Sequence, residues 1–314
     1  MTNEHVAVMT NEAMDYLAVK PNGIYVDATL GGGTHTSEIL KLSAPKGRVL
    51  SIDMDAVALN LAREKFGENK RWIPIMGNFR DLTEILKNQK FGQVDGVLMD
   101  LGFSTNQLND QIKGLSFQSD GPLDMRLGEG IDLTAAEIVN SWRREEIEKI
   151  LREYGEERYA RKIADEIVKA RKTAKIYRTA DLVEIIKRAV PASYERGRIN
   201  PATRTFQALR IAVNDELNSL RQGLEAAREA LQPGGRMVVI SFHSLEDRIV
   251  KQFFKNNSDL KPITKKPVVA GEEEIKKNPR SRSAKLRAAE KIKNQKHKLC
   301  QDSLPCHSQN HTRL

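Results

Sequence analysis

Apolar and polar positions alternate along the first hundred residues as they do in strands separated by helices. Four short apolar runs, each closed by a polar or glycine residue, predict buried strands at 23–30, 48–53, 72–76 and 94–100. The stretches between these runs have helical character, namely 36–42, 56–66 and 82–86. Because strands and helices follow one another in this way, the sequence predicts an α/β fold with a doubly wound, mostly parallel sheet.

This alternation stops near residue 107. No strand-like run occurs from 108 to 210, where polar loops give way to charged helical patterns at 134–154, 156–173 and 179–190. A longer pattern over 206–231 predicts one amphipathic helix, whose apolar face consists of Leu209, Val213, Leu217, Leu220 and Leu224. A strong strand is expected next, at 236–242. This order indicates a helical domain inserted into the α/β core.

The composition changes again near residue 255, where the chain becomes polar and basic. Residues 255–314 hold 15 Lys and Arg against 6 Asp and Glu, whereas the first 254 residues hold 36 of each. A basic tail on a neutral body suits binding to nucleic acid, and it is equally typical of a solvated terminus. We therefore predict an α/β core at 1–107 and 211–254, an inserted helical domain at 108–210, and a basic, partly disordered extension at 255–314.

The cysteine content and the hydropathy of the chain indicate the cellular compartment to expect. The two cysteines are Cys300 and Cys306, so a disulfide framework is not expected and a reducing cytoplasm is the natural location. Neither a signal-peptide pattern nor an apolar run of about 20 residues is present, so no membrane partner is expected. His297, His307 and His311 accompany the cysteines, but their spacing matches no zinc-site pattern and no metal is predicted.

A glycine loop, Gly31-Gly32-Gly33, follows the first predicted strand. Glycines there let a ligand approach the main chain at the start of a helix, where N–H groups point outward. Asp53, at the end of the second strand, can accept hydrogen bonds from both hydroxyls of a ribose. Asp27 precedes the loop, and its carboxylate would repel a pyrophosphate but can hold an ammonium group. These residues favour S-adenosyl-L-methionine over NAD; the alternative is a loop that only turns the chain.

Two further candidates follow the third and fourth strands. Phe79 could stack on an adenine, although an aromatic residue there is also typical of a core. Asp100 begins Asp-Leu-Gly-Phe-Ser, which resembles the Asp/Asn/Ser-Pro-Pro-aromatic motif of enzymes that methylate amino groups of bases but lacks both prolines. Its carboxylate would orient the lone pair of the amino nitrogen, or it would only cap a strand end. Residues 1–299 contain no cysteine, so carbon-5 methylation through a cysteine nucleophile is not expected.

The remaining candidates for substrate binding are two arginines and one histidine. Arg204 and Arg210 lie near the start of a predicted helix, where they could grip phosphates or form surface salt bridges. His243 follows the last predicted strand and could line a pocket for the target base, although the nearby sequence offers it neither a triad nor a metal partner.

Together these segments resemble one family closely, the bacterial small-subunit ribosomal RNA cytosine-N4 methyltransferases, also called the MraW family. The resemblance covers roughly residues 5–291, and its matching stretches are 5–8, 27–35, 100–104 with Gln107, 114–117, 120–126, 154–158, 200–217, 233–236, 240–251 and 278–283. The chain departs from the family at Ala7, where proline is usual, and at Thr34, where glycine is frequent. Residues 104–107 read Ser-Thr-Asn-Gln where the family typically has Ser-Ser-Pro-Gln.

The resemblance implies a Rossmann-like class I methyltransferase with an inserted, all-helical RNA-recognition domain. It implies S-adenosyl-L-methionine as cofactor and N4-methylcytosine in the decoding region of 16S ribosomal RNA as product. The 30S subunit would be the partner, with no DNA or membrane partner, and the enzyme would be a monomer or a homodimer. The family's cofactor residues carry over to Gly33, Thr34, His35, Asp53, Phe79, Asp100 and Gln107, and Asp100 is also the expected catalytic residue.

Two other functions stay open at the level of sequence. The same core could methylate a small molecule or a protein, but the inserted domain and the basic tail argue against this. The chain could also be a non-catalytic assembly factor that binds ribosomal RNA, but the intact glycine loop with Asp53 and Asp100 argues against that. Binding of ribosomal RNA tests the first alternative, and binding of S-adenosyl-L-methionine tests the second.

Overall fold

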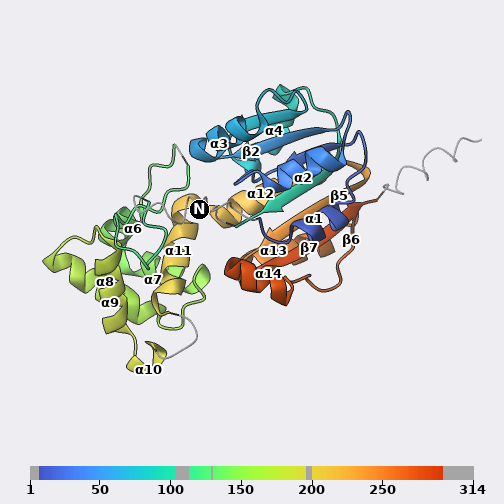
Figure 1. Cartoon of the computed structure of the whole chain (residues 1–314). Coiled ribbons are helices and arrows are strands. Elements are labelled where there is room, and N and C mark those ends of the chain that lie inside the picture. Colours follow the sequence, from blue (N-terminus) through green and yellow to red (C-terminus); the bar gives the residue numbers. More distant parts are fainter. Residues whose placement is uncertain (1–6, 103–112, 129, 196–199, 293–314) are drawn as a thin grey trace, which may run out of the picture.

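The computed structural model describes residues 7–102, 113–128, 130–195 and 200–292, which form a core domain and a helical domain (Figure 1). The core contains a seven-stranded sheet in the order β3-β2-β1-β4-β5-β7-β6. Its strands are β1 (Ile24–Asp27), β2 (Arg48–Asp53), β3 (Trp72–Met76), β4 (Val94–Asp100), β5 (Leu231–Ser241), β6 (Leu260–Pro262) and β7 (Lys285–Lys291). Strands β1 to β5 pair in parallel, and β7 is antiparallel to both of its neighbours. The predicted α/β class with a mostly parallel sheet is confirmed.

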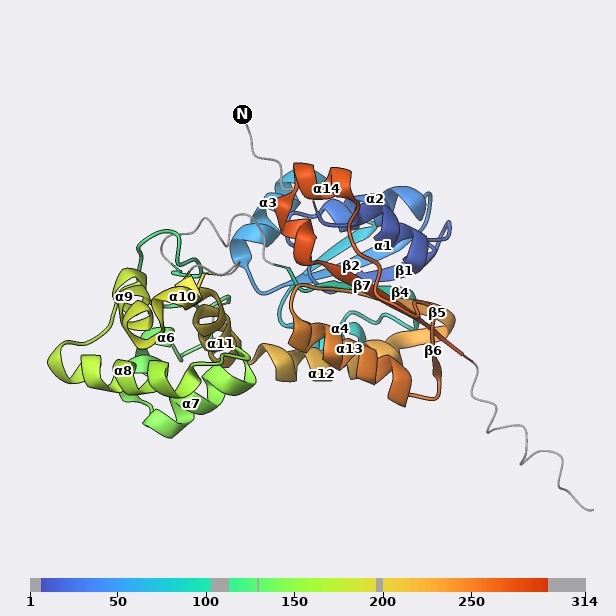
Figure 2. The same cartoon turned by 90° about the horizontal axis from the view of Figure 1, so that it is seen from below.

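Two layers of helices cover the sheet (Figure 2). One layer packs α1 (Thr10–Leu17), α2 (Thr34–Leu42) and α3 (Ala56–Phe66), and the other packs α4 (Leu82–Asn88), α12 (Glu216–Ala230) and α13 (Ser244–Asn256). Successive strand residues point to opposite layers, so Tyr25 belongs to the first core and Val26 to the second. Burial on both faces explains why the strands read as continuous apolar runs.

The winding of the chain reverses between β1 and β4, which pair directly with each other. From β1 the chain proceeds outward to β2 and β3, and from β4 it proceeds to β5 on the other side. Strands β1 and β4 end at Asp27 and Asp100, so these two residues stand at neighbouring carboxyl ends. Such a reversal point is where open α/β sheets bind their ligands.

Proline does not prevent β3 from pairing. The predicted strand at 72–76 is present, and Pro74 lies opposite Ser51 of β2. Strand β3 is at the edge of the sheet. A proline whose nitrogen faces the open side of an edge strand removes no hydrogen bond between strands.

The helical domain has a hydrophobic core of its own. It contains α6 (Ala135–Ser141), α7 (Arg144–Glu153), α8 (Ala160–Thr173), α9 (Thr179–Ala189), α10 (Ala192–Glu195) and α11 (Ala202–Asn214). The pattern predicted as one helix over 134–154 is two helices, because the chain turns after Ser141 and the Glu146 carboxylate accepts a hydrogen bond from the Arg143 N–H at 2.8 Å. None of the described helices combines the length and the apolar composition of a membrane span.

The pattern predicted as one helix over 206–231 is also broken. Asp215 has a left-handed backbone (φ 48°, ψ 42°), which ends α11 and starts α12 in a new direction. The break divides the apolar stripe between the two domains. Leu209 and Val213 lie in the helical-domain core, whereas Leu220 and Leu224 lie in the core of the sheet. Periodicity alone misses the break because the apolar spacing continues across Asp215.

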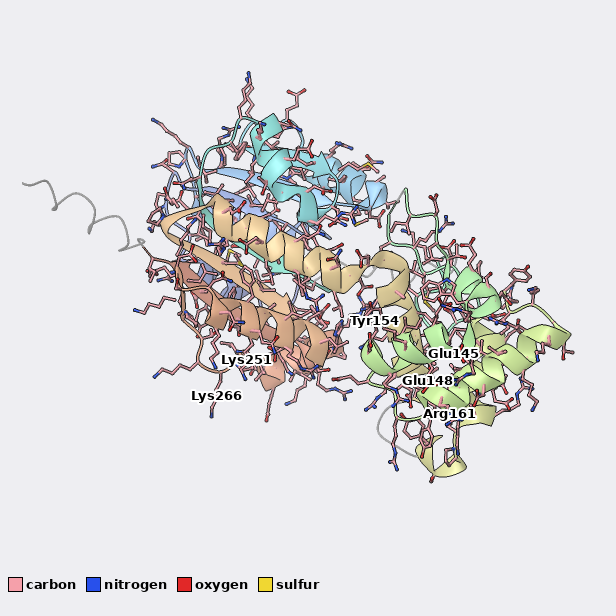
Figure 3. All side chains as sticks on the ribbon, turned by 180° about the vertical axis from the view of Figure 1, so that it is seen from behind. Glu145, Glu148, Tyr154, Arg161, Lys251 and Lys266 are labelled. Atoms are coloured by element: carbon pink, nitrogen blue, oxygen red, sulfur yellow. The ribbon has the colours of Figure 1, made fainter. Side chains whose placement is uncertain are left out.

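Contacts at the junction hold the two domains together. Tyr154, at the end of α7, packs in a small apolar cluster that contains Leu217 of α12 and Leu245 of α13. Figure 3 shows Tyr154 beside the core, with Lys251 and Lys266 pointing outward from the core. The Glu156 carboxylate accepts hydrogen bonds from the Ser244 hydroxyl at 2.5 Å and from Arg248 at 2.8 Å.

Residues 255–291 belong to the core and are not an extension of it. Strand β7 pairs with β5 over six positions, from Arg236↔Glu290 to Ser241↔Lys285. Helix α14 (Glu272–Lys277) and the 3-10 turn η2 (Pro279–Ser283) connect β6 to β7. The predicted boundary at 254 is therefore wrong, because the core continues through this segment. The partial disorder expected within 255–314 stays a prediction. The strand escaped prediction because it contains Arg287, whose buried charge is paired with Asp247 at 2.6 Å.

Candidate active site

A cavity of about 630 Å³ opens at the carboxyl ends of β1 and β4. Its wall combines the glycine loop and Asp100 of the core with Leu127, Arg210 and Asn214 of the helical domain. A cavity of this size suits a small organic ligand. Both domains must therefore be in place for the site to be complete.

Most of the predicted cofactor residues meet in this cavity. Its wall includes Thr34, His35, Asp53, Phe79 and Asp100. Gly33 is not part of the wall, which Gly31 and Gly32 form instead; Gly33 is the N-cap of α2, with a φ of 70°. Gln107 lies outside the described residues, as do the cysteines and histidines of the tail.

Asp53 is fixed by the main chain around it. Its two carboxylate oxygens accept N–H groups from Gly31 at 2.9 Å and from Asp55 at 2.8 Å. Each oxygen of a carboxylate has two lone pairs, so both remain able to accept a hydroxyl from a ligand. Burial raises the pKa of the carboxyl, and these hydrogen bonds oppose the rise. The glycine loop and the ribose acceptor predicted from sequence are thus joined by a direct hydrogen bond.

Asp27 lies outside the cavity wall, whereas the sequence suggested that its carboxylate could hold an ammonium group of the ligand. It is fully buried outside the cavity wall, where it accepts the Thr36 hydroxyl at 2.6 Å and the Thr29 N–H at 3.3 Å. Burial raises the pKa of Asp27 to about 7. Its position indicates that it braces the loop against α2 rather than binding an ammonium group.

Phe79 lies in the short turn η1 (Phe79–Asp81) that follows β3. Asn78 caps this turn, because its side chain accepts the Arg80 N–H at 3.0 Å. The ring packs over Gly223 of α12, where a β-carbon would lie 2.8 Å from Cε2. The absence of a side chain at residue 223 is therefore what allows Phe79 to line the cavity.

Asp100 is held by groups on three sides. Its N–H donates to the Thr29 hydroxyl at 2.6 Å, and its Oδ1 accepts the Gly102 N–H at 3.0 Å. Its Oδ2 lies 3.8 Å from Nδ1 of His35. A β-carbon at Gly102 would lie 3.0 Å from the carboxylate and 2.7 Å from the Phe242 ring, so glycine leaves the room that this arrangement needs.

His35 is neutral at physiological pH. Burial lowers the pKa of its imidazole to about 4, because the charged form loses its hydration. The ring lies in the cavity wall beside Asp100, so no imidazolium stands next to the Asp100 carboxyl group.

The two predicted phosphate-binding arginines occupy different environments. Arg210 lines the cavity, but its guanidinium donates to both carboxylate oxygens of Glu216, at 2.7 and 2.8 Å. Arg204 donates to the carbonyl of Glu156 at 2.6 Å and is not part of the wall. These contacts within the protein do not show whether either arginine binds RNA. RNA binding therefore stays a prediction for both residues.

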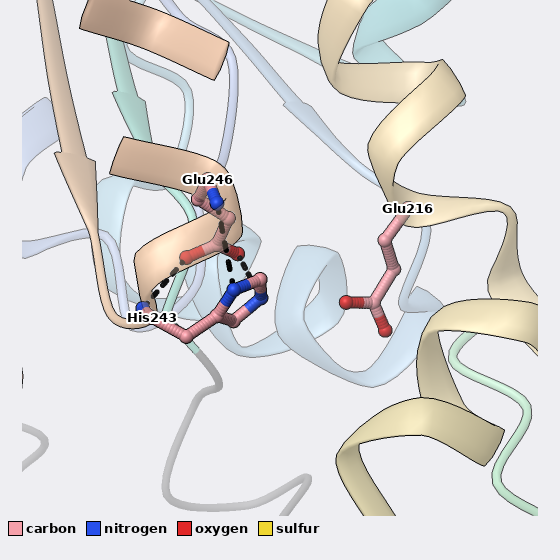
Figure 4. A group of neighbouring side chains, drawn as sticks. All are labelled: Glu216, His243 and Glu246. Atoms are coloured by element: carbon pink, nitrogen blue, oxygen red, sulfur yellow. Dashed lines mark hydrogen bonds and ion pairs between the residues drawn. The ribbon is translucent and has the colours of Figure 1, made fainter. Parts of the chain in front are cut away.

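His243 caps α13 and does not line the cavity (Figure 4). Its Nδ1 accepts the Glu246 N–H at 3.4 Å, and its Nε2 lies 3.2 Å from a Glu246 oxygen. Within the described residues, Glu216, His243 and Glu246 are close enough to hold a metal ion. However, Arg210 occupies both oxygens of Glu216, and Glu246 accepts the N–H groups of Phe242 and His243. These contacts engage both carboxylates, while Nε2 of His243 is buried without a hydrogen-bond partner, and we assign no metal to the group.

Several wall residues were not predicted from the sequence. Glu246 and Phe242 line the cavity in place of their neighbour His243. The segment after β6 supplies Lys277, Pro279 and Arg280. The only available signal for this segment was its match to the family pattern, because its composition indicated a solvated tail.

Two buried polar atoms of the cavity wall could form hydrogen bonds with a polar ligand. Within the described residues, Nε2 of His35 and Oγ of Ser219 are buried without a hydrogen-bond partner, and both residues line the cavity. An unmet buried polar atom costs on the order of 1–3 kcal/mol, which hydrogen bonds to a ligand would offset. Together with the Asp53 carboxylate, the glycine loop and the Phe79 ring, these atoms fit the nucleoside and amino-acid parts of S-adenosyl-L-methionine.

The sequence matches the profile of the MraW methylase family over residues 2–292. The chain belongs to this family. Membership in a methylase family agrees with the cofactor expected from the sequence, S-adenosyl-L-methionine, and confirms the family resemblance.

Individual relatives of this MraW family member are similar along their whole length. The ribosomal RNA small subunit methyltransferase H of Geobacter sulfurreducens is 49% identical, with 93% of this chain and 100% of the relative covered. The protein of the same name from Carboxydothermus hydrogenoformans is 50% identical, with 93% and 99% covered. Among solved structures, fibrillarin of Aeropyrum pernix with bound S-adenosyl-L-methionine is a distant match, with 12% identity, a TM-score of 0.42, and 89% of this chain and 73% of that chain covered.

Proposed function

We propose that this MraW family member uses S-adenosyl-L-methionine to methylate N4 of a cytosine in the decoding region of small-subunit ribosomal RNA. The observation that carries this proposal is the position of Asp100. Its carboxylate stands in the cavity wall at the end of β4, oriented by the Gly102 N–H, in a chain whose relatives are named for small-subunit ribosomal RNA. Among the described residues of the cavity wall there is no cysteine, which suits direct transfer to an amino nitrogen.

Different residues of the wall would bind different parts of the cofactor. Asp53 would accept the ribose hydroxyls, and the N–H groups of the glycine loop would face the cofactor. Phe79 would pack against the adenine. When bound, the cofactor supplies a methyl group on a positively charged sulfonium. His35 is neutral, so it places no positive charge beside that sulfonium.

Asp100 would position the acceptor. A carboxylate accepts hydrogen bonds only, so it would bind the amino hydrogens of cytosine and turn the nitrogen lone pair toward the methyl group. The nitrogen would take the methyl group with its lone pair while the carbon–sulfur bond breaks and leaves a neutral thioether, and the nitrogen would then release one proton to solvent. Positioning in the cavity contributes to the rate because it replaces a bimolecular encounter by a prearranged one.

The direct test is transfer to the proposed substrate. Undermethylated small ribosomal subunits are incubated with the enzyme and isotopically labelled S-adenosyl-L-methionine, and the modified nucleotide is mapped by mass spectrometry. We expect label at N4 of one cytosine in the decoding region. Label on protein, on DNA or at carbon-5 of a pyrimidine would contradict the proposal.

A further inference from the structure

The connection between β6 and β7 brings a basic segment to the cavity. Strand β7 is antiparallel to β5, and Lys285 at its start pairs with Ser241 at the end of β5. The residues before Lys285 therefore leave the sheet at the edge where β4 ends in Asp100. Lys277 and Arg280 accordingly line the same cavity as Asp100. Figures 1 and 2 show α14 at the end of the core that faces the helical domain.

This segment is fixed at both ends. At its start, the Glu274 carboxylate accepts the Met9 N–H at 2.7 Å, which ties α14 to the N-terminal part of the core. At its end, the Ser281 hydroxyl is fully buried and donates to the Asn278 carbonyl at 2.7 Å. The Asn278 side chain accepts the Arg280 N–H at 3.3 Å. The two cations are thus held on a defined turn rather than on a loose loop.

The charges around this segment distinguish it from the opposite wall. There, Arg210 is neutralised by both oxygens of Glu216. No carboxylate of the described residues lies within salt-bridge distance of Lys277, and the nearby Glu274 is engaged with Met9. Burial lowers the pKa of the Arg280 guanidinium, so its charge is partly desolvated. An anion at this position would stabilise the ammonium group of Lys277.

Exposure places the two cations at the mouth of the cavity. Lys277 and Arg280 line the wall, yet both residues are exposed to solvent. A nucleotide whose base enters the cavity keeps its phosphates on the solvent side, where such side chains can reach them. Arginine offers paired donors to a phosphate, and lysine offers a point charge. Phosphate contacts of this kind fix the register of a nucleic acid without reading its sequence.

We propose that Lys277 and Arg280 bind the backbone phosphates that flank the target nucleotide of the RNA substrate. This inference rests on the proposed function, because it takes RNA as the substrate. The carboxylate of the cofactor is another anion that these cations could bind. The experiment distinguishes binding of this carboxylate from binding of RNA phosphates.

The test compares two double variants of equal charge. Lys277→Ala with Arg280→Gln removes the two cations of the wall, and Lys276→Ala with Arg282→Gln removes two exposed cations of the same segment outside the wall. Thermal unfolding checks that both variants fold. Affinity for a decoding-region RNA fragment is measured over a range of salt concentrations, and affinity for S-adenosyl-L-methionine is measured by calorimetry.

For the wall variant we expect RNA binding to weaken at least tenfold, with cofactor affinity within twofold of the native protein. The dependence of log K on log salt should become shallower by about 0.7 per lost contact, as for single strands. The control variant should bind RNA within about threefold of the native protein. Equal losses in both variants, or a loss of cofactor affinity with RNA binding intact, would overturn the inference. If the native protein itself neither binds nor methylates the RNA, the proposed function fails instead.

Discussion

The ring of Phe79 rests on Gly223, in contact too close for any side chain at residue 223. A β-carbon there would lie 2.8 Å from Cε2 of the ring and closer still to Cδ2. Gly223 is in the interior of α12, where glycine is usually unfavourable by roughly 0.5–1 kcal/mol relative to alanine. The helix therefore carries an unfavourable residue at the point where Phe79 enters the cavity wall.

The substitution Gly223→Ala tests this relationship. Helix propensity alone would stabilise the variant, but the new methyl group must push Phe79 away from its place in the wall. We expect affinity for S-adenosyl-L-methionine, measured by calorimetry, to fall about tenfold. Gln222→Ala, on the exposed side of the same helix, is the control and should bind normally. A Gly223→Ala protein that is more stable and binds the cofactor normally would refute the positioning role.

Substitution of Asp100 should separate chemistry from folding. Asp100→Ala removes the acceptor of the amino hydrogens, so we expect methyl transfer to fall by at least about a hundredfold. Asp100→Asn keeps one acceptor oxygen for the Gly102 N–H and should retain more activity than the alanine variant. Transfer of labelled methyl groups and thermal unfolding measure the two effects. Activity near the native level in Asp100→Ala would rule out a catalytic role.

The two glutamates that pair with arginines near the domain junction should differ in their effect on stability. Arg210 and Glu216 are 16% and 15% exposed, so Glu216→Gln removes the charge of the carboxylate that binds a mostly buried guanidinium and should lower the free energy of unfolding by about 3 kcal/mol. Arg248 and Glu156 are 53% and 42% exposed, and Glu156→Gln should change it by less than about 1 kcal/mol. Urea unfolding of both variants gives the comparison. Equal effects would show that burial does not govern these pairs.

The pH dependence of the free energy of unfolding should show the contribution of His35. Its pKa is about 4 in the folded protein, below the ordinary value of about 6.5, so the unfolded chain binds more protons between these values. Stability from this group is complete above about pH 6.5 and is lost as the pH falls toward 4, by about 3 kcal/mol. Asp27 acts in the opposite direction, since its raised pKa of about 7 makes stability fall as the pH rises from about 4 to 7.

His35→Gln removes the first contribution and leaves the second. Urea unfolding at several pH values between about 4 and 7 should therefore show the variant losing stability as the pH rises, while the native protein shows a flatter profile. Parallel profiles for the two proteins would mean that His35 titrates in the folded state as it does in the unfolded chain.

The candidate site was predictable wherever one short segment supplied both the geometry and the chemistry. Asp53 and Asp100 end buried strands, and the carboxyl ends of parallel strands meet at one edge, so their convergence followed from the strand pattern. Asp27 was misjudged because the same pattern does not reveal that its carboxylate turns inward to Thr36. For His243 the strand end was right, but its imidazole caps α13 and lies beside the wall residues Glu216 and Glu246 without being part of the wall itself.

The sequence by itself determined the alternation of strands and helices, the glycine loop and the acids at the strand ends, because each depends on local periodicity and residue type. Only the tertiary structure decided that the helix over 206–231 breaks at Asp215, and that β7 enters the sheet beside β5. Both outcomes depend on partners distant in sequence: two separate cores that divide one apolar stripe, and Asp247, which pairs with the buried charge of Arg287. The same long-range pairing brings Lys277 and Arg280 to the cavity, which no local pattern could have placed there.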